Sequence, residues 1–302
     1  MIKIERKQIS KDGTVKFLVR LENSSLLETV LMCADYGNSV CVSSQAGCNM
    51  GCKFCASGLL KKEYDLKAEE MLAQVELAQR ELETKNSEGK ITHVVVMGSG
   101  EPFDNYDEVI RFLDIITDEK KLKEINSPLS MIAPRHATVS TCGIIPKIYD
   151  FAKIKKRYQL AISLHAPNNE IRDELMPVNK KFPIIKRKSE GTGKSPSLLE
   201  AIKDYTEITG KRVTLEYILL KGINDSKEAA EELAKNLEGL DVYVNLIPFN
   251  GVKEFDLNGV SKEEALEFYD ILMKKKIKAT LRKERGRDID AACGQLRNKV
   301  IN

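Results

Sequence analysis

The feature that restricts the fold most is a regular alternation of short apolar runs with longer amphipathic segments, which begins near residue 39. The short runs are rich in β-branched residues and predict strands at residues 40–42, 92–97, 137–140, 159–164, 212–219, 242–247 and 278–282. The amphipathic segments predict helices at residues 68–84, 106–117, 198–209, 227–237 and 262–275. Such alternation is typical of a parallel sheet covered by helices, so we predict an α/β fold, a partial TIM-like (β/α)6 barrel.

The first 38 residues have a different pattern. Polar and apolar residues alternate in TVKFLVRL and SLLETVLM, and the pairs Asp12-Gly13 and Tyr36-Gly37 predict turns. We therefore expect an N-terminal β extension, a hairpin, over residues 1–38 and the barrel over residues 39–302. Residues 185–197, IKRKSEGTGKSPS, have no apolar period and predict an exposed, mobile loop.

The composition narrows the class of protein. The chain has 302 residues, 42% hydrophobic and 31% charged, which is typical of a soluble globular protein. It contains no apolar run near the roughly 18 residues that a membrane span needs. The first residues, MIKIERKQISKDG, lack the apolar stretch of a secretory signal, so we expect a cytoplasmic protein without a membrane partner. The net charge is only +3, but basic residues cluster locally and permit a polyanionic partner.

Three of the seven cysteines, Cys48, Cys52 and Cys55, lie within eight residues, just after a predicted strand. Three thiolates can hold a [4Fe–4S] cluster and leave one iron open to the amino and carboxylate groups of S-adenosylmethionine (SAM). The alternative is a zinc site, which usually needs a second pair of ligands that this sequence does not offer. The spacing therefore predicts a radical SAM enzyme that uses a [4Fe–4S] cluster and SAM.

Small and polar residues follow several predicted strands. Gly100 and Glu101 come after the strand at 92–97, and Glu101 could bind an ammonium group. The others are Ser140, Ser163, His165 and Asn250. A glycine turn is often merely a turn, and a lone serine or histidine is usually structural. Their repeated position at strand ends, where barrel active sites lie, favours a ligand-binding rim.

The remaining cysteines allow two interpretations. Cys33 and Cys142 are most simply packing or rim residues. Cys41 and Cys293, taken singly, are more often structural. Brought to one active site, however, two thiols could alternate between a covalent intermediate and a resolving disulfide.

Six blocks of sequence carry a family resemblance. They are CVSSQAGCNMGCKFCASG, MGSGEP, ISLHAPN, EYILLKGINDS, NLIPFN and RGRDIDAACGQL. From about residue 28 to residue 296 the chain resembles the RlmN/Cfr family of radical SAM RNA adenosine methyltransferases. NLIPFN and RKERGRDIDAACGQL are more similar to the RlmN branch, which methylates C2 of adenosine in 23S rRNA and tRNA. The Cfr branch methylates C8 in 23S rRNA.

The resemblance implies a mechanism with two SAM per turnover. One SAM methylates Cys293, and a radical from the second removes a hydrogen from that methyl group. The carbon radical adds to C2, Glu28 removes the C2 proton, and Cys41 attacks the sulfur of Cys293 to release the product. The implied SAM contacts are Gly100, Glu101, Ser140, Ser163, Leu164, His165 and Asn250.

Glu28 also has an ordinary interpretation, because an acidic residue on a hairpin strand usually faces solvent. To act as a base it would have to reach over the barrel mouth, with the hairpin as a lid. The resemblance implies as partners RNA (23S rRNA, tRNA or both) and an electron donor such as flavodoxin or ferredoxin, and we expect a monomer.

The chain departs from the family pattern in several places. In this family a small helical accessory domain usually precedes the hairpin; from this sequence we expect none, which leaves open how RNA docks. GSGEP replaces the usual GMGEP, and TCG with Cys142 replaces TSG or TVG. The basic loop at 185–197 is a candidate contact for RNA phosphates. Two alternatives stay open: Cfr-type C8 methylation, and a non-catalytic iron-sulfur protein that binds RNA.

Overall fold

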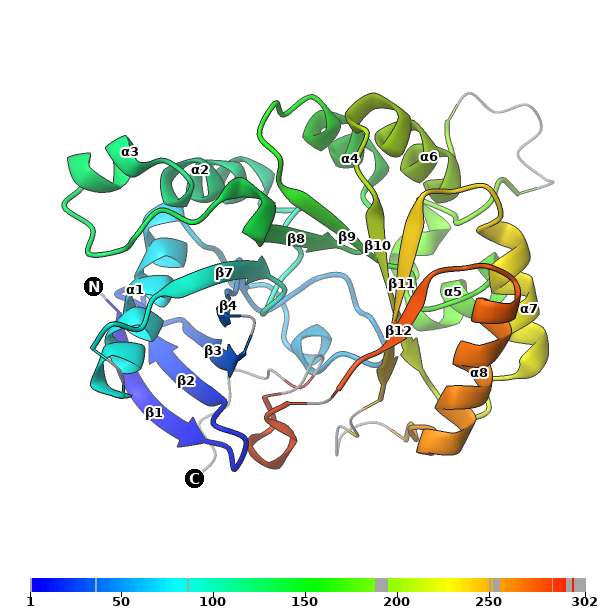
Figure 1. The fold of residues 1–302 in the computed structure, drawn as a ribbon, viewed down its shortest axis with the longest axis horizontal. Helices are drawn as coiled ribbons and strands as arrows, with labels where there is room; N and C mark the ends of the chain where they lie inside the picture. The colour runs from blue at the N-terminus through cyan, green and yellow to red at the C-terminus, as the bar shows by residue number, and fades with distance from the viewer. Residues whose placement is uncertain are drawn as a thin grey trace.

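One curved sheet organises the molecule (Figure 1). The computed structural model describes residues 2–35, 37–85, 87–187, 195–249, 251, 256–283, 285–291 and 295. Its strands are β1 (Lys3–Ile9), β2 (Val15–Arg20), β3 (Leu26–Ala34), β4 (Gly37–Cys41), β5 (Gln45–Ala46), β6 (Tyr64–Asp65), β7 (Ile91–Val96), β8 (Ala137–Thr141), β9 (Gln159–Ser163), β10 (Val213–Leu219), β11 (Val242–Pro248) and β12 (Ala279–Leu281). Ten of them form the main sheet in the order β1-β2-β3-β4-β7-β8-β9-β10-β11-β12, and β5 pairs with β6.

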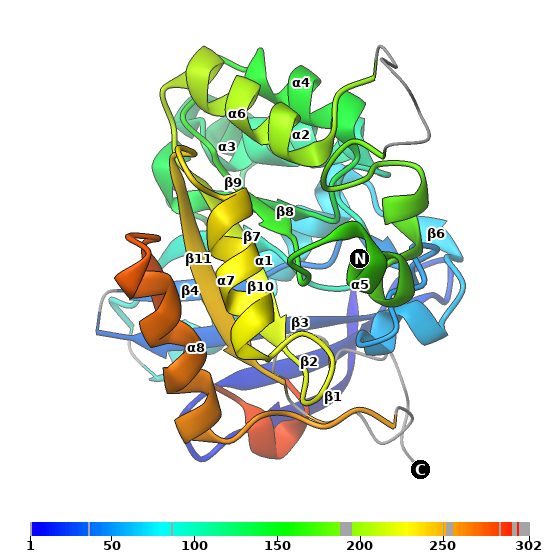
Figure 2. The same ribbon diagram turned by 90° about the vertical axis from the view of Figure 1, so that its right-hand side faces the viewer.

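The helices cover the outside of this sheet (Figures 1 and 2). They are α1 (Ala68–Lys85), α2 (Tyr106–Ile116), α3 (Glu119–Glu124), α4 (Ile145–Ala152), α5 (Asn169–Leu175), α6 (Leu198–Thr209), α7 (Lys227–Asn236) and α8 (Lys262–Lys274), with 3₁₀ turns η1 (Ala56–Leu59), η2 (Pro134–His136), η3 (Pro177–Lys180) and η5 (Arg287–Ile289). The five predicted helices are confirmed. The prediction missed α3, α4 and α5, because they are too short to show a clear helical period.

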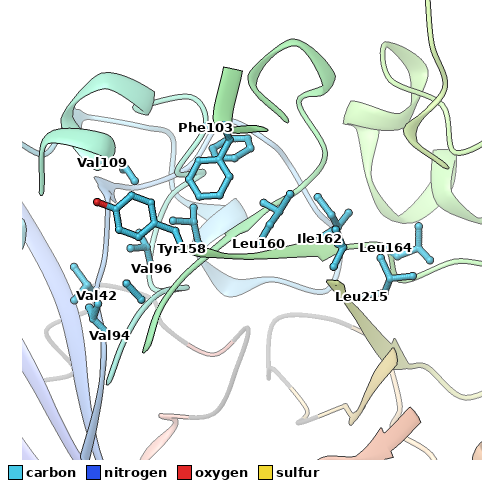
Figure 3. Close-up of a cluster of buried hydrophobic side chains, with 14 of the residues drawn as sticks. Val42, Val94, Val96, Phe103, Val109, Tyr158, Leu160, Ile162, Leu164 and Leu215 are labelled. Carbon is cyan, nitrogen blue, oxygen red and sulfur yellow. The ribbon is translucent and has the colours of Figure 1, made fainter. Parts of the chain in front are cut away.

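The barrel prediction is also confirmed. Seven strands, β4 and β7 to β12, pair in parallel and alternate with helices. Alternate side chains of these strands point outward, so that Val94 and Val96 of β7 and Leu160 and Ile162 of β9 meet the helices in a shared core (Figure 3). The pairing order places β1 and β12 at opposite ends of the sheet, so the barrel is partial.

The N-terminal extension continues the barrel sheet. β2 pairs antiparallel with β3, and β3 pairs antiparallel with β4, the first barrel strand. The expected turn at Asp12-Gly13 is present, with Gly13 at φ +83°. The expectation of a lid is wrong, because the hairpin extends the edge of the sheet instead of lying over the barrel mouth. A domain boundary at residue 38 stays a prediction.

The C-terminal segment, residues 285–291, lies against this extension at the tip of the β1–β2 hairpin (red in Figure 1). Asp288 accepts a hydrogen bond from Ser10 Oγ at 2.5 Å, and the backbone N–H of Gly286 donates to Asp12 Oδ2 at 2.9 Å. Arg285 Nη1 donates to the carbonyl of Cys33 at 2.8 Å. Hydrogen bonds therefore join the C-terminal segment to the N-terminal extension.

The predicted loop at 185–197 is described only at its ends, and its central residues 188–194 lie outside the described residues. At its C-terminal end Ser197 caps α6, where its side chain and that of Glu200 form a capping box. No helix in the described part of the chain combines the length and apolarity that crossing a membrane requires.

Candidate functional site

The cysteine loop, residues 47–60, leaves the sheet after β4 and is closed at its base by the β5–β6 pair. The backbone N–H of Cys48 donates to the carbonyl of Leu60 at 2.9 Å. Gly47 has φ +78°, and a Cβ there would collide with the carbonyl of Lys61. The loop is therefore fixed at both ends before any ligand binds.

Cys48, Cys52 and Cys55 line one cavity, as their spacing predicts. Burial, reinforced by the neighbouring thiols, raises the pKa of Cys48 to about 12 and the pKa of Cys52 well above its usual range. A bound metal overcomes such a shift, because it takes thiolates as ligands and neutralises their charge. Three thiols that line one cavity are the ligand set that a [4Fe–4S] cluster with one open iron requires.

Glu101 forms the polar floor of the cavity. Its Oε1 accepts hydrogen bonds from Thr141 Oγ1 at 2.5 Å and the Phe103 N–H at 3.0 Å, and its Oε2 accepts from the Cys142 N–H at 2.8 Å. Burial raises the pKa of this carboxyl, and these hydrogen bonds oppose the increase. The carboxylate is held rigidly, with capacity left for a cationic ligand group.

The nearby glycines also have a packing role. A Cβ on Gly98 would lie 2.5 Å from Ser43 Oγ, and one on Gly100 would lie 2.5 Å from Cβ of Gln45. Gly100 also has φ +102°. Both glycines therefore make room for the protein's own segment after β4, which in turn holds Glu101 through a hydrogen bond from its N–H to Gln45 Oε1 at 2.8 Å.

His165 also lines the cavity. Its Nδ1 accepts a hydrogen bond from the Ile218 N–H at 3.0 Å, and its ring meets Phe54 edge-on at 4.7 Å between centroids. Burial lowers the pKa of His165 to about 3, so the imidazole is neutral at physiological pH. Because Nδ1 accepts, Nε2 carries the proton and is a donor.

The register of the sheet decides which residues share the concave side. Ser140 lines the cavity, and its strand neighbour Thr138, two residues earlier, pairs with Val95. Val95 pairs with Cys41, and Cys41 pairs with Val30 of β3, two residues after Glu28. Paired residues, and residues two apart on a strand, point to the same side of a sheet. Cys41 and Glu28 therefore face the same side as Ser140.

Most of the predicted binding residues meet in the cavity. Gly100, Glu101, Ser140, Ser163 and His165 all line it. Leu164 does not, because alternation turns its side chain into the outer core (Figure 3). Glu28 is buried with 5% of its surface exposed, against its ordinary interpretation as a solvent-facing residue. Asn250 and Cys293 lie outside the described residues.

The sequence interpretation missed several cavity residues. Glu216 and Arg282 line the cavity, and Glu216 accepts a hydrogen bond from Asn245 Nδ2 at 2.8 Å. Cys142 was not missed in the same way: it lines the cavity, in agreement with its interpretation as a rim residue. A charged residue inside an otherwise apolar strand, as Glu216 is in VTLEYIL, is the signal that could have identified Glu216.

Arg172 supports the site from behind. It is fully buried, and its Nη2 donates to the carbonyls of Cys142 at 2.7 Å and Ser163 at 2.9 Å. Its Nε donates to the carbonyl of Leu164 at 3.0 Å. Burial lowers the pKa of Arg172 to about 10, which leaves it charged at neutral pH. One guanidinium thus ties together the ends of β8 and β9.

Comparison with known proteins places the chain in a family. The Radical SAM superfamily model matches residues 42–234. The probable dual-specificity RNA methyltransferase RlmN of Spiroplasma citri is 50% identical over 299 residues, covering 99% of this chain and 80% of that protein. The protein of the same name from Enterococcus faecalis is 50% identical over 298 residues, covering 97% of this chain and 78% of that protein.

A solved structure agrees over the whole fold. The crystal structure of a radical SAM methyltransferase from Sphaerobacter thermophilus has a TM-score of 0.89 and 40% sequence identity, and the match covers 99% of this chain and 82% of that one. The chain therefore belongs to the RlmN family within the radical SAM superfamily, whose members use a [4Fe–4S] cluster and SAM.

Proposed function

We propose that this protein methylates C2 of adenosine in 23S rRNA, in tRNA or in both, through a methylated Cys293 and with two SAM per turnover. C2 of adenine is an electron-poor carbon, so polar transfer of a methyl group to it is unfavourable. A family that generates radicals supplies the required chemistry. The observation that supports this proposal best is the register of the sheet, because it places Glu28 and Cys41 on the same side as the cavity residue Ser140.

The cavity residues divide into two groups. Cys48, Cys52 and Cys55 would hold three irons of the cluster, which when bound supplies the electron that cleaves SAM to a 5′-deoxyadenosyl radical. Glu101 would bind the ammonium group of SAM, and the neutral His165 would donate from Nε2. Gly100, Ser140 and Ser163 would complete the SAM contacts of the cavity. Asn250, which lies outside the described residues, is a further proposed SAM contact. Leu164 would anchor their turn in the core.

Glu28, Cys293 and Cys41 would act in sequence on the RNA adduct. Glu28 would accept the C2 proton of the adenine that is covalently attached to Cys293 through the transferred carbon. After the ring radical of this adduct has passed one electron to an acceptor, the electrons of the C–H bond would restore the aromatic ring. The Cys41 thiolate would then attack the sulfur of Cys293 to form a disulfide. The C–S bond would break with its electron pair going to carbon, which takes up a proton to become the methyl group. Two thiols are thereby oxidised, and an external reductant must regenerate them.

The remaining proposals concern partners. We propose RNA as substrate, a flavodoxin or ferredoxin as electron donor, a monomeric state and a cytoplasmic location. The relatives named above support the RNA substrate through their description as RNA methyltransferases. Phosphate contacts from the basic residues of the 185–197 loop are also a proposal, and deleting the loop without loss of RNA affinity would contradict it.

The activity test uses the protein with its cluster reconstituted anaerobically, then mixed with SAM, a reductant and bulk RNA. Mass spectrometry of the nucleosides should detect 2-methyladenosine. Detection of 8-methyladenosine would favour the Cfr-type reaction instead. A stable cluster that never cleaves SAM would favour a non-catalytic protein.

Two variants test the thiol roles within the same assay. Cys293→Ala should abolish methylation, because no sulfur carries the methyl group. Cys41→Ala should trap a covalent complex of protein and RNA, visible as a shifted band that ribonuclease removes. Normal turnover by Cys41→Ala would contradict the resolving role, while Cys33→Ala is the matched control that should behave like the unmodified protein.

A further inference from the structure

Lys16 is a buried lysine in the middle of β2, with only 6% of its surface exposed. Its neighbours Val15 and Phe17 are fully buried in the core, so alternation turns Lys16 to the opposite side of the sheet. Lysine is rarely buried, because removing its ammonium group from water is costly unless a partner compensates the charge. The position of Lys16 therefore requires an explanation from its partners.

Two partners meet at the Lys16 ammonium group, and they come from different parts of the chain. Nζ lies 3.1 Å from Glu28 Oε1, and both side chains are more than nine-tenths buried. The same Nζ donates to the carbonyl of Asp290 at 3.0 Å. An ammonium group has three N–H donors, so it can satisfy both partners at once.

We propose that Lys16 is a positioning residue that holds the Glu28 carboxylate and the C-terminal segment in a fixed relation. The proposal rests on the function proposed above, in which Glu28 accepts a proton and Cys293 carries the methyl group. Asp290 precedes Cys293 by three residues in the sequence. Lys16 holds both Glu28 and the carbonyl of Asp290. The point from which the chain continues toward Cys293 is therefore restricted relative to Glu28.

The other contacts of the C-terminal segment explain docking but not this alignment. Ser10, Asp12 and the carbonyl of Cys33 bind residues 285–288 at the partly exposed end of the segment. None of these three contacts includes Glu28. Lys16 contacts both Asp290 of the segment and the proposed base, and its buried charge also offsets that of the Glu28 carboxylate.

The test compares Lys16→Met, Lys16→Arg and the control Lys7→Met in the cluster-loaded protein with SAM. Lys7 also forms an ion pair from the extension, but with Glu81 of α1; in the described part of the chain it contacts neither Glu28 nor Asp290. Hydrogen exchange of residues 285–291 is the first readout. Lys16→Met should raise it about tenfold or more, Lys16→Arg should restore most of the protection, and Lys7→Met should leave it unchanged.

The second readout separates positioning from general damage. Lys16→Met should lower the yield of methylated RNA about tenfold or more, while cluster content and the rate of SAM cleavage change less than about twofold. Unchanged exchange in residues 285–291 would overturn the proposal, and so would full methylation despite lost protection. If the unmodified protein makes no methyladenosine, the proposed function fails, yet the exchange experiment still decides whether Lys16 holds the segment.

A second variant covers the case in which Lys16→Met does not fold. The double variant Lys16→Met with Glu28→Gln leaves no uncompensated charge in the sheet, so it should fold. It should show the same increase in hydrogen exchange at residues 285–291 as Lys16→Met. Protection equal to that of Glu28→Gln alone would overturn the role of Lys16.

Discussion

The cavity and the contact between the C-terminal segment and the extension are held together in different ways. Around the cavity, Glu101, His165 and Arg172 are all buried, and each is fixed by hydrogen bonds within the protein. The contact combines exposed groups, Asp12 and Asp288, with the buried side chains of Ser10, Lys16 and Glu28. Buried networks are rigid, whereas exposed polar contacts separate at little cost. The difference indicates a preformed cofactor site and a C-terminal segment that can be released.

The largest effect should come from removing a thiol of the cavity. Cys52→Ala should abolish cluster assembly and with it all SAM cleavage, because two thiolates cannot hold three irons. The measurements are iron and sulfide content after anaerobic reconstitution and the yield of 5′-deoxyadenosine. Cys33→Ala, a half-buried thiol on β3, is the control and should keep both. A full cluster in Cys52→Ala would contradict the assignment of the ligands.

A smaller but still substantial effect should follow from crowding the rigid wall of the cavity. Gly100→Ala should lower the free energy of unfolding by about 2–5 kcal/mol, because it combines a left-handed backbone with overpacking against Gln45. Gly239→Ala is the matched control, since Gly239 has φ +78° but open space around its Cα. It should cost only the backbone strain, about 1–2 kcal/mol.

Denaturant unfolding of the two glycine variants measures the difference. Equal losses would show that Gln45 moves aside easily and that this wall is less rigid than its contacts indicate. The difference between the losses, rather than either value, measures the packing of the segment after β4 on Gly100.

The sequence predicted the cavity more completely than it predicted the contact. Short-range spacing identified the three cluster cysteines, and strand-end positions identified Glu101, Ser140 and His165. These features are local, because a parallel barrel brings all its strand ends to one rim. Residues whose role depends on the register of distant strands were missed. Lys16 is a clear case, since its partners Glu28 and Asp290 are apparent only when the sheet places both ends of the chain together.

The lid failed as a prediction for a related reason. The proposed role of Glu28 requires its side chain to face the concave side of the sheet. From the sequence alone, a hairpin folded over the barrel mouth would satisfy this requirement. The structure uses antiparallel pairing of β3 with β4 instead, so that simple alternation delivers the side chain. Nothing in the local pattern of SLLETVLM distinguishes these two arrangements, because both present the same residues on the same side of the strand.

The cavity and the contact should lose stability at different pH values when the protein is acidified. Burial lowers the pKa of His165 to about 3, below its value in the unfolded chain. The unfolded chain then binds the extra proton first, so the stability due to neutral His165 is lost as the pH falls from about 6.5 toward 3. The loss should be about 1.4 kcal/mol per pH unit within this window, or about 2 kcal/mol at pH 5.

Asp12 in the contact responds at lower pH. Burial alone would raise the pKa of Asp12, but hydrogen bonds from the backbone N–H groups of Thr14 and Gly286 lower it to about 2. The stability from charged Asp12 is present above about pH 4 and is lost as the pH falls toward 2. The contact between the C-terminal segment and the extension should therefore persist between about pH 6.5 and pH 4, where the cavity has already lost stability through His165.

His165→Gln isolates the first of these effects. Its stability should depend less steeply on pH than that of the unmodified protein between pH 6.5 and 5. The comparison with the unmodified protein is needed because Glu101 changes stability in the opposite direction. Burial raises the pKa of Glu101, so its protonation at low pH favours the folded form. Identical slopes for the two proteins would show that His165 is not the neutral, buried acceptor that its contact with the Ile218 N–H indicates.

The smallest effect is expected for an exposed ion pair of the extension. Lys7 Nζ lies 3.0 Å from Glu81 Oε2 and joins β1 to α1, but the Lys7 side chain is 43% exposed. Lys7→Met should change the free energy of unfolding by less than about 1 kcal/mol, because water and salt screen the pair. The loss should shrink further at high salt. A larger, salt-independent loss would mean that the extension is held as rigidly as the cavity, and the contrast between the two regions would not hold.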